Sequence, residues 1–147
     1  MAEARARNFR GSRSNGPPAP ASPALSIVVA EDDDAVRRVL VHALTFGGFH
    51  VEAASTGVEA LDRIRHNHPD VIVLDLILPW LDGREILVRL RQHPAFRATP
   101  VLIVTGTPTS EDDLQSFAPV ALLRKPFTVP ALLTAVRHLS SRPTIVE

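Results

Sequence analysis

The sequence predicts an α/β fold, a three-layer sandwich in which a parallel sheet lies between two layers of helices. Five short apolar runs alternate with five segments of helical period after residue 24. The runs are continuous rather than alternating, which is typical of parallel strands buried on both faces. Parallel strands are joined by right-handed crossovers, so the alternation places helices on both sides of one sheet.

The five apolar runs give the expected strands, and β-branched residues are frequent in them. We expect strands at residues 25–30, 49–54, 71–75, 101–105 and 120–123. The third is the clearest, because four aliphatic residues lead directly to Asp75.

Caps and breakers place the expected helices between these strands. An Asp, Ser or Thr that can accept the first free backbone N–H groups precedes four of the helical segments. These caps are Asp33 or Asp34, Ser55 or Thr56, Ser110, and Thr128. The first helix ends at the Gly47-Gly48 pair and the second ends at Asn67. The third spans residues 84–92, the fourth is a short helix starting at Glu111, and the fifth carries a proline in its first turn, where proline is tolerated.

We expect one domain with two short extensions. The 147 residues are enough for one hydrophobic core. Residues 1–24 carry four arginines, one glutamate and four prolines, and we interpret them as a disordered leader. The domain then covers residues 25–140, and residues 141–147 form a short tail.

Composition argues against several functional classes. The chain has no cysteine, which excludes disulfides and thiolate metal sites. Basic and acidic residues number 16 each, so no overall charge favours nucleic acid, and the six histidines lack metal-ligand spacing and are interpreted as surface positions. No apolar run approaches the roughly 20 residues of a membrane span, and a secretory signal is lacking. We therefore expect a cytoplasmic protein with no membrane contact.

Polar side chains stand at the exits of four expected strands. They are Glu31 and Asp32 after the first, Asp75 at the end of the third, Thr105 at the end of the fourth, and Lys125 after the fifth. Ligands of an open parallel sheet bind at the carboxyl ends of its strands, so these groups are expected to converge. Each one alone is equally well explained as a cap, a turn residue or a surface charge, and only their joint occurrence indicates a site.

The grouped acids predict a magnesium site. Two carboxylates brought to about 4 Å repel by roughly 4 kcal/mol at an effective dielectric near 20, so a proton or a cation must compensate. An all-oxygen ligand set selects a hard ion, and Mg²⁺ fits. Beside such an ion, with Lys125 and Thr105 contacting phosphate oxygens, Asp75 could attack phosphorus and form an acyl phosphate.

Four sequence blocks resemble the response-regulator receiver family of bacterial two-component systems, in that family's order. The blocks are IVVAEDDDAVRR, VIVLDLILPWLDG, VLIVTG and LLRKPF, and the resemblance covers residues 25–140. It implies the flavodoxin-like receiver fold, with five parallel strands in the order 2-1-3-4-5. The block with Asp75, Leu76, Leu78, Pro79, Asp82 and Gly83 is the most specific.

The resemblance also implies roles for individual residues. Asp75 is the expected phosphoacceptor, Thr105 the switch hydroxyl, and Lys125 the lysine that contacts the phosphoryl group, followed by a cis bond to Pro126. Mg²⁺ is expected to bind Asp32 directly, Glu31 through water, and Asp75. The backbone carbonyl of Ile77 is the remaining expected protein ligand.

The chain departs from the family pattern in its output region. Leu122 replaces the aromatic residue expected three positions before Lys125, and the chain has no tyrosine. The stretch between Thr105 and Lys125 is also about two residues short, which predicts a truncated fourth helix. We therefore expect signal output to use the first helix or the loop after Thr105 rather than an aromatic rotamer.

The sequence thus predicts a single-domain response regulator that is not an enzyme. It is expected to take a phosphoryl group from a sensor histidine kinase or a histidine phosphotransfer protein and to act through an unknown downstream protein, without binding DNA. Two alternatives stay open. One is a phosphorylation-independent adaptor, and the other is a small Mg²⁺-dependent phosphohydrolase, which is disfavoured because Ile77 occupies the position of that class's general acid.

Overall fold

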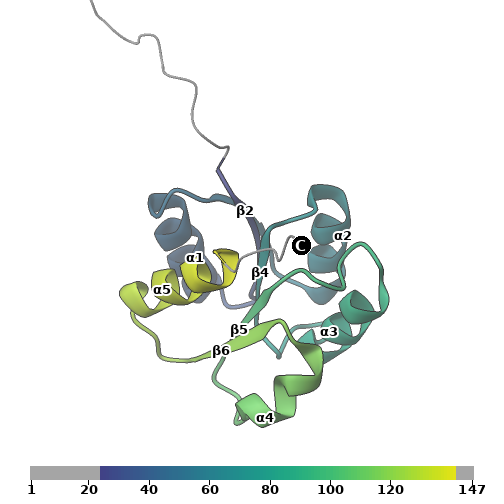
Figure 1. Cartoon of the computed structure of the whole chain (residues 1–147). Helices are drawn as coiled ribbons and strands as arrows, with labels where there is room; N and C mark the ends of the chain where they lie inside the picture. The colour runs from purple at the N-terminus through teal and green to yellow at the C-terminus, as the bar shows by residue number, and fades with distance from the viewer. Residues whose placement is uncertain (1–23, 142–147) are drawn as a thin grey trace, which may run out of the picture.

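The computed structural model describes residues 24–141 and contains a five-stranded parallel sheet (Figure 1). The strands are β2 (Ser26–Ala30), β3 (His50–Ala54), β4 (Val71–Leu74), β5 (Val101–Thr105) and β6 (Val120–Arg124). Their order across the sheet is β3-β2-β4-β5-β6, which confirms the expected order 2-1-3-4-5. Residues 1–23 of the expected leader and residues 142–147 of the expected tail lie outside the described residues.

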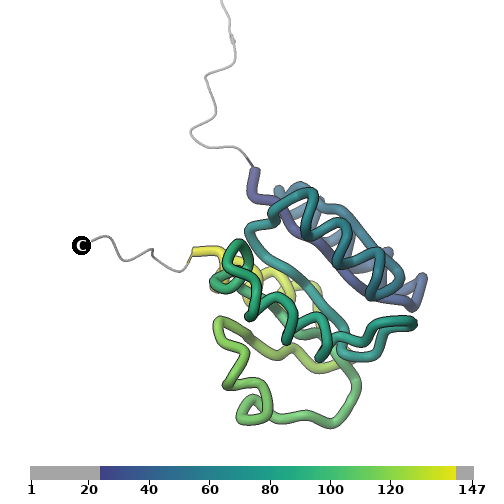
Figure 2. The backbone as a smooth tube through the Cα atoms, turned by 90° about the vertical axis from the view of Figure 1, so that its right-hand side faces the viewer, coloured from purple at the N-terminus to yellow at the C-terminus, as the bar shows by residue number. Residues whose placement is uncertain are grey.

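Helices cover both faces of the sheet, as the alternating pattern predicts. They are α1 (Asp34–Phe46), α2 (Gly57–Asn67), α3 (Gly83–Gln92), α4 (Glu111–Leu114), the 3-10 turn η1 (Gln115–Phe117) and α5 (Val129–Ser140). Helices α1 and α5 lie on one face, whereas α2 and α3 lie on the other, which faces the viewer in Figure 2. No helix in the described part of the chain is long and apolar enough to cross a membrane.

The strands are buried on both faces, so their side chains divide between two cores. In β2, Ile27 and Val29 pack with the apolar sides of α1 and α5, whereas Val28 and Ala30 pack with α2 and α3. This division follows from the two-residue period of a strand. It explains why the strands are continuous apolar runs rather than alternating ones.

Most predicted boundaries agree with the structure to within one or two residues. Of the alternative caps, Asp33 accepts from the Val36 N–H and Thr56 accepts from the Glu59 N–H. Five ends differ from the prediction by one residue: β2 begins at Ser26, β3 begins at His50, β4 stops at Leu74, α3 already begins at Gly83, and β6 continues to Arg124. The backbone hydrogen bonds of the folded chain decide these ends, which the local sequence pattern places only to within a residue or two.

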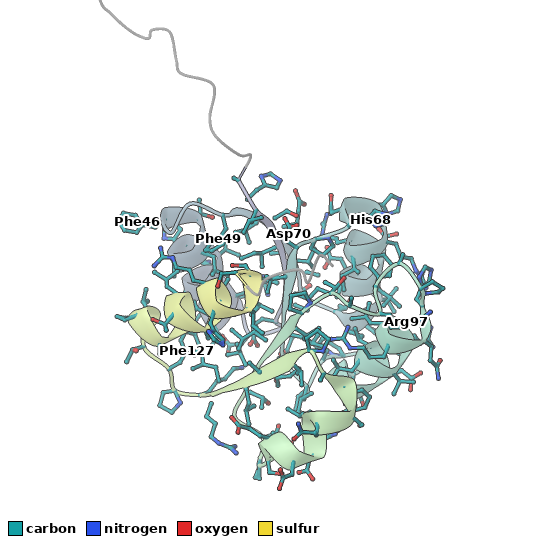
Figure 3. The ribbon with its side chains drawn as sticks, viewed as in Figure 1. Phe46, Phe49, His68, Asp70, Arg97 and Phe127 are labelled. Carbon is teal, nitrogen blue, oxygen red and sulfur yellow. The ribbon has the colours of Figure 1, made fainter. Side chains whose placement is uncertain are left out.

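The predicted surface positions and the short fourth helix are also confirmed. All six histidines are exposed, and His68, near the end of α2, is one of those labelled in Figure 3. Helix α4 has four residues and is followed by the three residues of η1. Ser110 and Asp113 form a reciprocal capping box around its first turn, which stabilises a helix too short to persist by propensity alone.

The loop after β4 is held against the start of α2 by a close backbone approach. Gly57 donates its N–H to the Pro79 carbonyl at 3.2 Å. A Cβ added to Gly57 would lie 1.7 Å from the carbonyl oxygen of Leu81, a distance that no packed structure tolerates. Glycine is therefore required here because the two backbones touch.

We predict that Gly57→Ala destabilises the protein by about 2–3 kcal/mol, because the added methyl group must push the loop away from α2. Gly106→Ala is the matched control, since its Cβ would meet its nearest atom, Lys125 Cβ, at an ordinary 3.8 Å. Urea unfolding measures both free energies. Equal changes in the two variants would contradict the predicted contact.

Candidate phosphoacceptor site

The exits of four neighbouring strands gather the polar residues that the sequence predicted. Glu31 directly follows β2, Asp75 directly follows β4, and Lys125 directly follows β6. Thr105 is the last residue of β5. Because β2, β4, β5 and β6 are adjacent and parallel, their carboxyl ends meet at one edge of the sheet.

Lys125 bridges two of the predicted acids. Its Nζ atom lies 2.7 Å from Glu31 Oε1 and 2.8 Å from Asp75 Oδ2, and it donates a hydrogen bond to each. Both carboxylates are buried, with Glu31 only 1% exposed. Lys125 is the only lysine in a chain that otherwise uses arginine. A compact ammonium fits between two carboxylates where a planar guanidinium would need more room.

A third acid completes a cluster that is suited to a cation. Glu31, Asp32 and Asp75 each offer a carboxylate oxygen, and these three oxygens lie within 4.8 Å of one another. Three ionised carboxylates and one ammonium carry a formal charge of −2, which a divalent ion would balance. The donors are all oxygen, as Mg²⁺ prefers, and the exposed Asp32 leaves the cluster open to solvent. The residues present therefore fit this ion.

Burial and hydrogen bonding have opposite effects on the pKa of Glu31, and likewise on the pKa of Lys125. Burial raises the pKa of Glu31, and the hydrogen bonds from Lys125 and the Asp33 N–H offset only part of that rise. Burial lowers the pKa of Lys125, but its hydrogen bonds to Asp75 and Glu31 outweigh this effect, so its pKa is raised overall. Lys125 is consequently held in its charged form beside the acids.

Thr105 and Ile77 occupy the edges of the site. The buried Thr105 hydroxyl accepts a hydrogen bond from the Thr107 N–H at 3.2 Å, within its own loop. The Ile77 N–H donates to Asp75 Oδ1 at 3.2 Å, and the Ile77 side chain is exposed. The expected cis bond between Lys125 and Pro126 is present, and a second one joins Ala118 to Pro119.

Several residues that support the site were assigned no role from the sequence. Arg37, on α1, donates to the backbone carbonyls of Glu31 at 3.0 Å and Asp32 at 3.4 Å, and so fixes the exit of β2. Arg84 donates to the hydroxyl of the buried Thr109, and Arg124 donates to the Thr109 carbonyl. The last two contacts anchor the loop after Thr105. They join residues 25 and 15 positions apart, and no local sequence pattern signals them.

Gly83 allows helix α3 to start directly against the phosphoacceptor candidate. The Gly83 N–H donates to the Leu76 carbonyl at 2.8 Å. A Cβ at this position would lie 2.4 Å from the Asp75 carbonyl oxygen, so any larger residue would displace the backbone of Asp75. This contact explains the glycine at the end of the DLILPWLDG segment.

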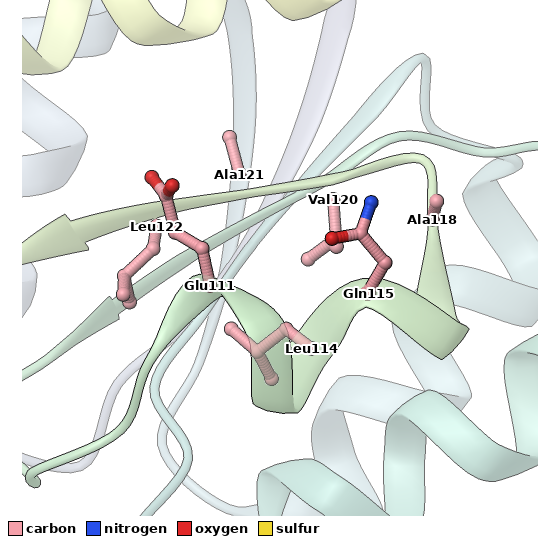
Figure 4. Close-up of a pocket in the computed structure, with 7 residues that line it drawn as sticks. All are labelled: Glu111, Leu114, Gln115, Ala118, Val120, Ala121 and Leu122. Carbon is pink, nitrogen blue, oxygen red and sulfur yellow. The ribbon is translucent and has the colours of Figure 1, made fainter.

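The short α4 leaves a cavity beside β6 that is separate from the acidic cluster. Its volume is about 240 Å³, and α4, η1 and β6 line it (Figure 4). Leu122, at the position where an aromatic residue was expected, is one of the lining residues and is half-buried. The short helix α4 and Leu122, the two features in which the sequence departs from the family pattern, thus both line this cavity.

The doubly wound sheet and the acidic cluster at its carboxyl edge define a flavodoxin-like domain of the receiver class. Residues 27–137 match the response regulator receiver domain family, and the chain belongs to that family. Receiver domains are signalling modules that interact with histidine kinases, bind Mg²⁺ at an acidic pocket and generally are not enzymes.

Individual relatives agree with this membership. The response regulator MprA of Mycobacterium sp. strain KMS is 40% identical over 118 residues, which make up 79% of this chain and 50% of that protein. The chain therefore spans about half the length of the curated relatives it matches. The Vibrio cholerae chemotaxis protein CheY4 has 26% identity and a TM-score of 0.73, over 79% of this chain and 98% of that one.

A third protein of the same fold has a metal in its solved structure. It is the receiver domain of the sensor histidine kinase PA1611 from Pseudomonas aeruginosa PAO1, whose structure has a magnesium ion in its active-site cleft. The identity is 24% and the TM-score 0.73, over 81% of this chain and 99% of that one.

We predict that Lys125→Met lowers the free energy of unfolding by about 2–4 kcal/mol in EDTA, because Glu31 and Asp75 then repel each other without a cation. Millimolar Mg²⁺ should restore part of this loss. Arg137→Met, which removes an exposed charge from α5, is the control and should change stability by less than about 0.5 kcal/mol. A Lys125→Met loss that Mg²⁺ leaves unaltered would contradict the prediction.

Proposed function

We propose that Asp75 accepts a phosphoryl group from the phosphohistidine of a sensor histidine kinase or a histidine phosphotransfer protein. A bond forms between an Asp75 carboxylate oxygen and phosphorus while the nitrogen–phosphorus bond breaks, and its electron pair returns to the histidine ring. The single observation that carries the proposal is the position of Asp75, which shares Lys125 with Glu31 at the carboxyl edge of a receiver fold.

The chain's own residues supply most of the positioning. Lys125 donates a hydrogen bond to Asp75 Oδ2, and its ammonium can contact the phosphoryl oxygens after transfer. The Ile77 N–H fixes Asp75 Oδ1, so the orientation of the carboxylate is set before reaction. Thr105 is proposed to donate its hydroxyl hydrogen to the phosphoryl group, since the oxygen accepts from the Thr107 N–H and the hydrogen stays available.

Asp32, Asp75 and the carbonyl of Ile77 are the proposed direct ligands of Mg²⁺, and Glu31 is proposed to bind it through water. When bound, this ion supplies positive charge that neutralises the phosphoryl oxygens. The support for this assignment is the oxygen-only cluster and its formal charge of −2, which one divalent cation would balance.

The wider setting stays a set of predictions. These are that the domain acts as a single-domain regulator in the cytoplasm, that its downstream partner is a protein, and that it does not contact DNA. The relative MprA is about twice as long as the region that matches this chain. The similarity therefore does not assign the activity of the whole of MprA to this chain.

The direct test is phosphorylation by a small donor. We predict that the native chain, incubated with phosphoramidate and Mg²⁺, gains the mass of one phosphoryl group, and that hydroxylamine removes it, as expected for an acyl phosphate. Asp75→Asn should gain none, and EDTA should slow the native reaction at least tenfold. A label that persists in Asp75→Asn would place the acceptor elsewhere, and continuous turnover of phosphate esters would favour a phosphohydrolase.

We also predict slow self-dephosphorylation, because the exposed Ile77 side chain lies two residues past the acceptor and offers no group to orient water. Hydrolysis breaks the phosphorus–oxygen bond to Asp75 and releases inorganic phosphate. Ile77→Asn, which can hold a water molecule, should shorten the half-life of the phosphoprotein several-fold in time courses of intact mass. An unchanged or longer half-life would refute the role of this side chain.

A further inference from the structure

The turn after the acceptor contains a backbone conformation that is unusual for its residue. Trp80 has φ +73°, in the positive-φ region, and is the central residue of a γ-turn in which the Leu81 N–H donates to the Pro79 carbonyl. Glycine and asparagine enter this region readily, whereas a bulky aromatic residue is rarely found there because its Cβ crowds the backbone. Such an outlier near a reactive group is a reason to look for a function of the side chain.

The fold does not explain why this residue is a tryptophan. The Trp80 side chain is 85% exposed, so it contributes little to the core. The turn is held by its neighbours instead. Leu78 is buried, Leu81 packs against the core, and the Pro79 carbonyl accepts hydrogen bonds from the N–H groups of Gly57 and Leu81. Glycine or asparagine would meet a lower steric cost at this φ, so the turn itself gives no reason for an indole.

Other exposed apolar side chains belong to the same part of the molecule. Ile77 is 59% exposed, and its N–H donates to the acceptor carboxylate of Asp75. Val58, also exposed, follows Gly57, whose N–H is bonded to Pro79. We call Val58, Ile77 and Trp80 the apolar rim. The apolar rim carries no charge, and its member Ile77 adjoins the acidic cluster through the bond to Asp75.

We propose that the apolar rim is a docking surface for the protein that donates the phosphoryl group, with Trp80 as its central contact. This inference rests on the proposed function of Asp75. Because Asp75 is only 6% exposed, a phosphohistidine must be pressed into the mouth of the site, and the surface around that histidine must then cover the rim. The partner is accordingly a protein that carries an apolar patch beside its phosphohistidine, against which an exposed indole buries a large area.

The test compares a protein donor with a small donor in the Trp80→Asn variant, since asparagine enters the positive-φ region more readily than tryptophan. The protein donors are autophosphorylated catalytic fragments of histidine kinases from the same organism, and the fragment that labels the native chain fastest is used. We expect Trp80→Asn to lower kcat/KM for this donor at least tenfold, mainly through KM, while labelling by phosphoramidate stays within twofold of native.

Phe46→Asn is the matched control. Phe46 is also an exposed aromatic residue. It is the last residue of α1, about 18 Å along the helix from the first residue of α1, and its side chain points away from the domain (Figure 3). It should leave labelling by both donors within twofold of native. Urea unfolding of Trp80→Asn should give a midpoint equal to or above the native one, which separates a lost contact from a lost fold.

The outcomes are distinguishable. If the native chain takes no label from phosphoramidate, the proposed function of Asp75 fails. If phosphoramidate labels it normally, the rim proposal is overturned when Trp80→Asn accepts phosphoryl groups from the kinase fragment at the native rate, when both donors are slowed equally, or when no fragment labels the native chain.

Fluorescence gives an independent readout, because Trp80 is the only tryptophan. Adding the unphosphorylated kinase fragment in a tryptophan-free form should shift the emission of Trp80 to shorter wavelength and protect it from acrylamide. The rim could instead serve a second copy of this chain. Sedimentation that shows a dimer abolished by Trp80→Asn, together with native transfer rates, would overturn the donor assignment.

Discussion

The ammonium of Lys125, shared between Glu31 and Asp75, is the interaction on which the functional edge of this domain depends. Two buried carboxylates a few ångströms apart would repel strongly, and the cation from β6 offsets that repulsion. The same contacts join the exits of β2, β4 and β6 across the sheet. The charge that offsets this repulsion is thus the charge that a transferred phosphoryl group would meet.

The parallel sheet makes this arrangement possible because all of its strands end at the same edge. Backbone contacts then set the fine positions: Arg37 holds the carbonyls of Glu31 and Asp32, and Gly83 brings the start of α3 against Asp75. The reactive side chains therefore sit on loops, but on loops fixed to rigid elements, as catalytic and binding groups commonly are. The loop after Thr105 is tied down in the same way by Arg84 and Arg124.

The region around α4 and the turn at Trp80 give this chain its individual character within the receiver family. A four-residue α4 and Leu122 leave a cavity beside β6, where the output side of the domain was expected to carry an aromatic residue. In the loop after β4, a turn with an unusual backbone angle presents an indole to solvent five residues past Asp75. The proposed docking surface and the expected output region therefore belong to different elements, the turn after β4 and the segment from α4 to β6.

The sequence by itself determined the fold class, the five strands and the identity of the clustered residues, because continuous apolar runs, caps and the acid, hydroxyl and lysine at strand exits are local signals. Only the tertiary structure decided that Lys125 bridges Glu31 and Asp75, that Thr105 is bonded to Thr107, and that Arg37, Arg84 and Arg124 brace the loops. It also revealed the γ-turn at Trp80. The physical reason is that hydrogen-bond partners and backbone angles depend on the approach of distant segments, such as Gly57 to Leu81, which no periodicity along the chain encodes.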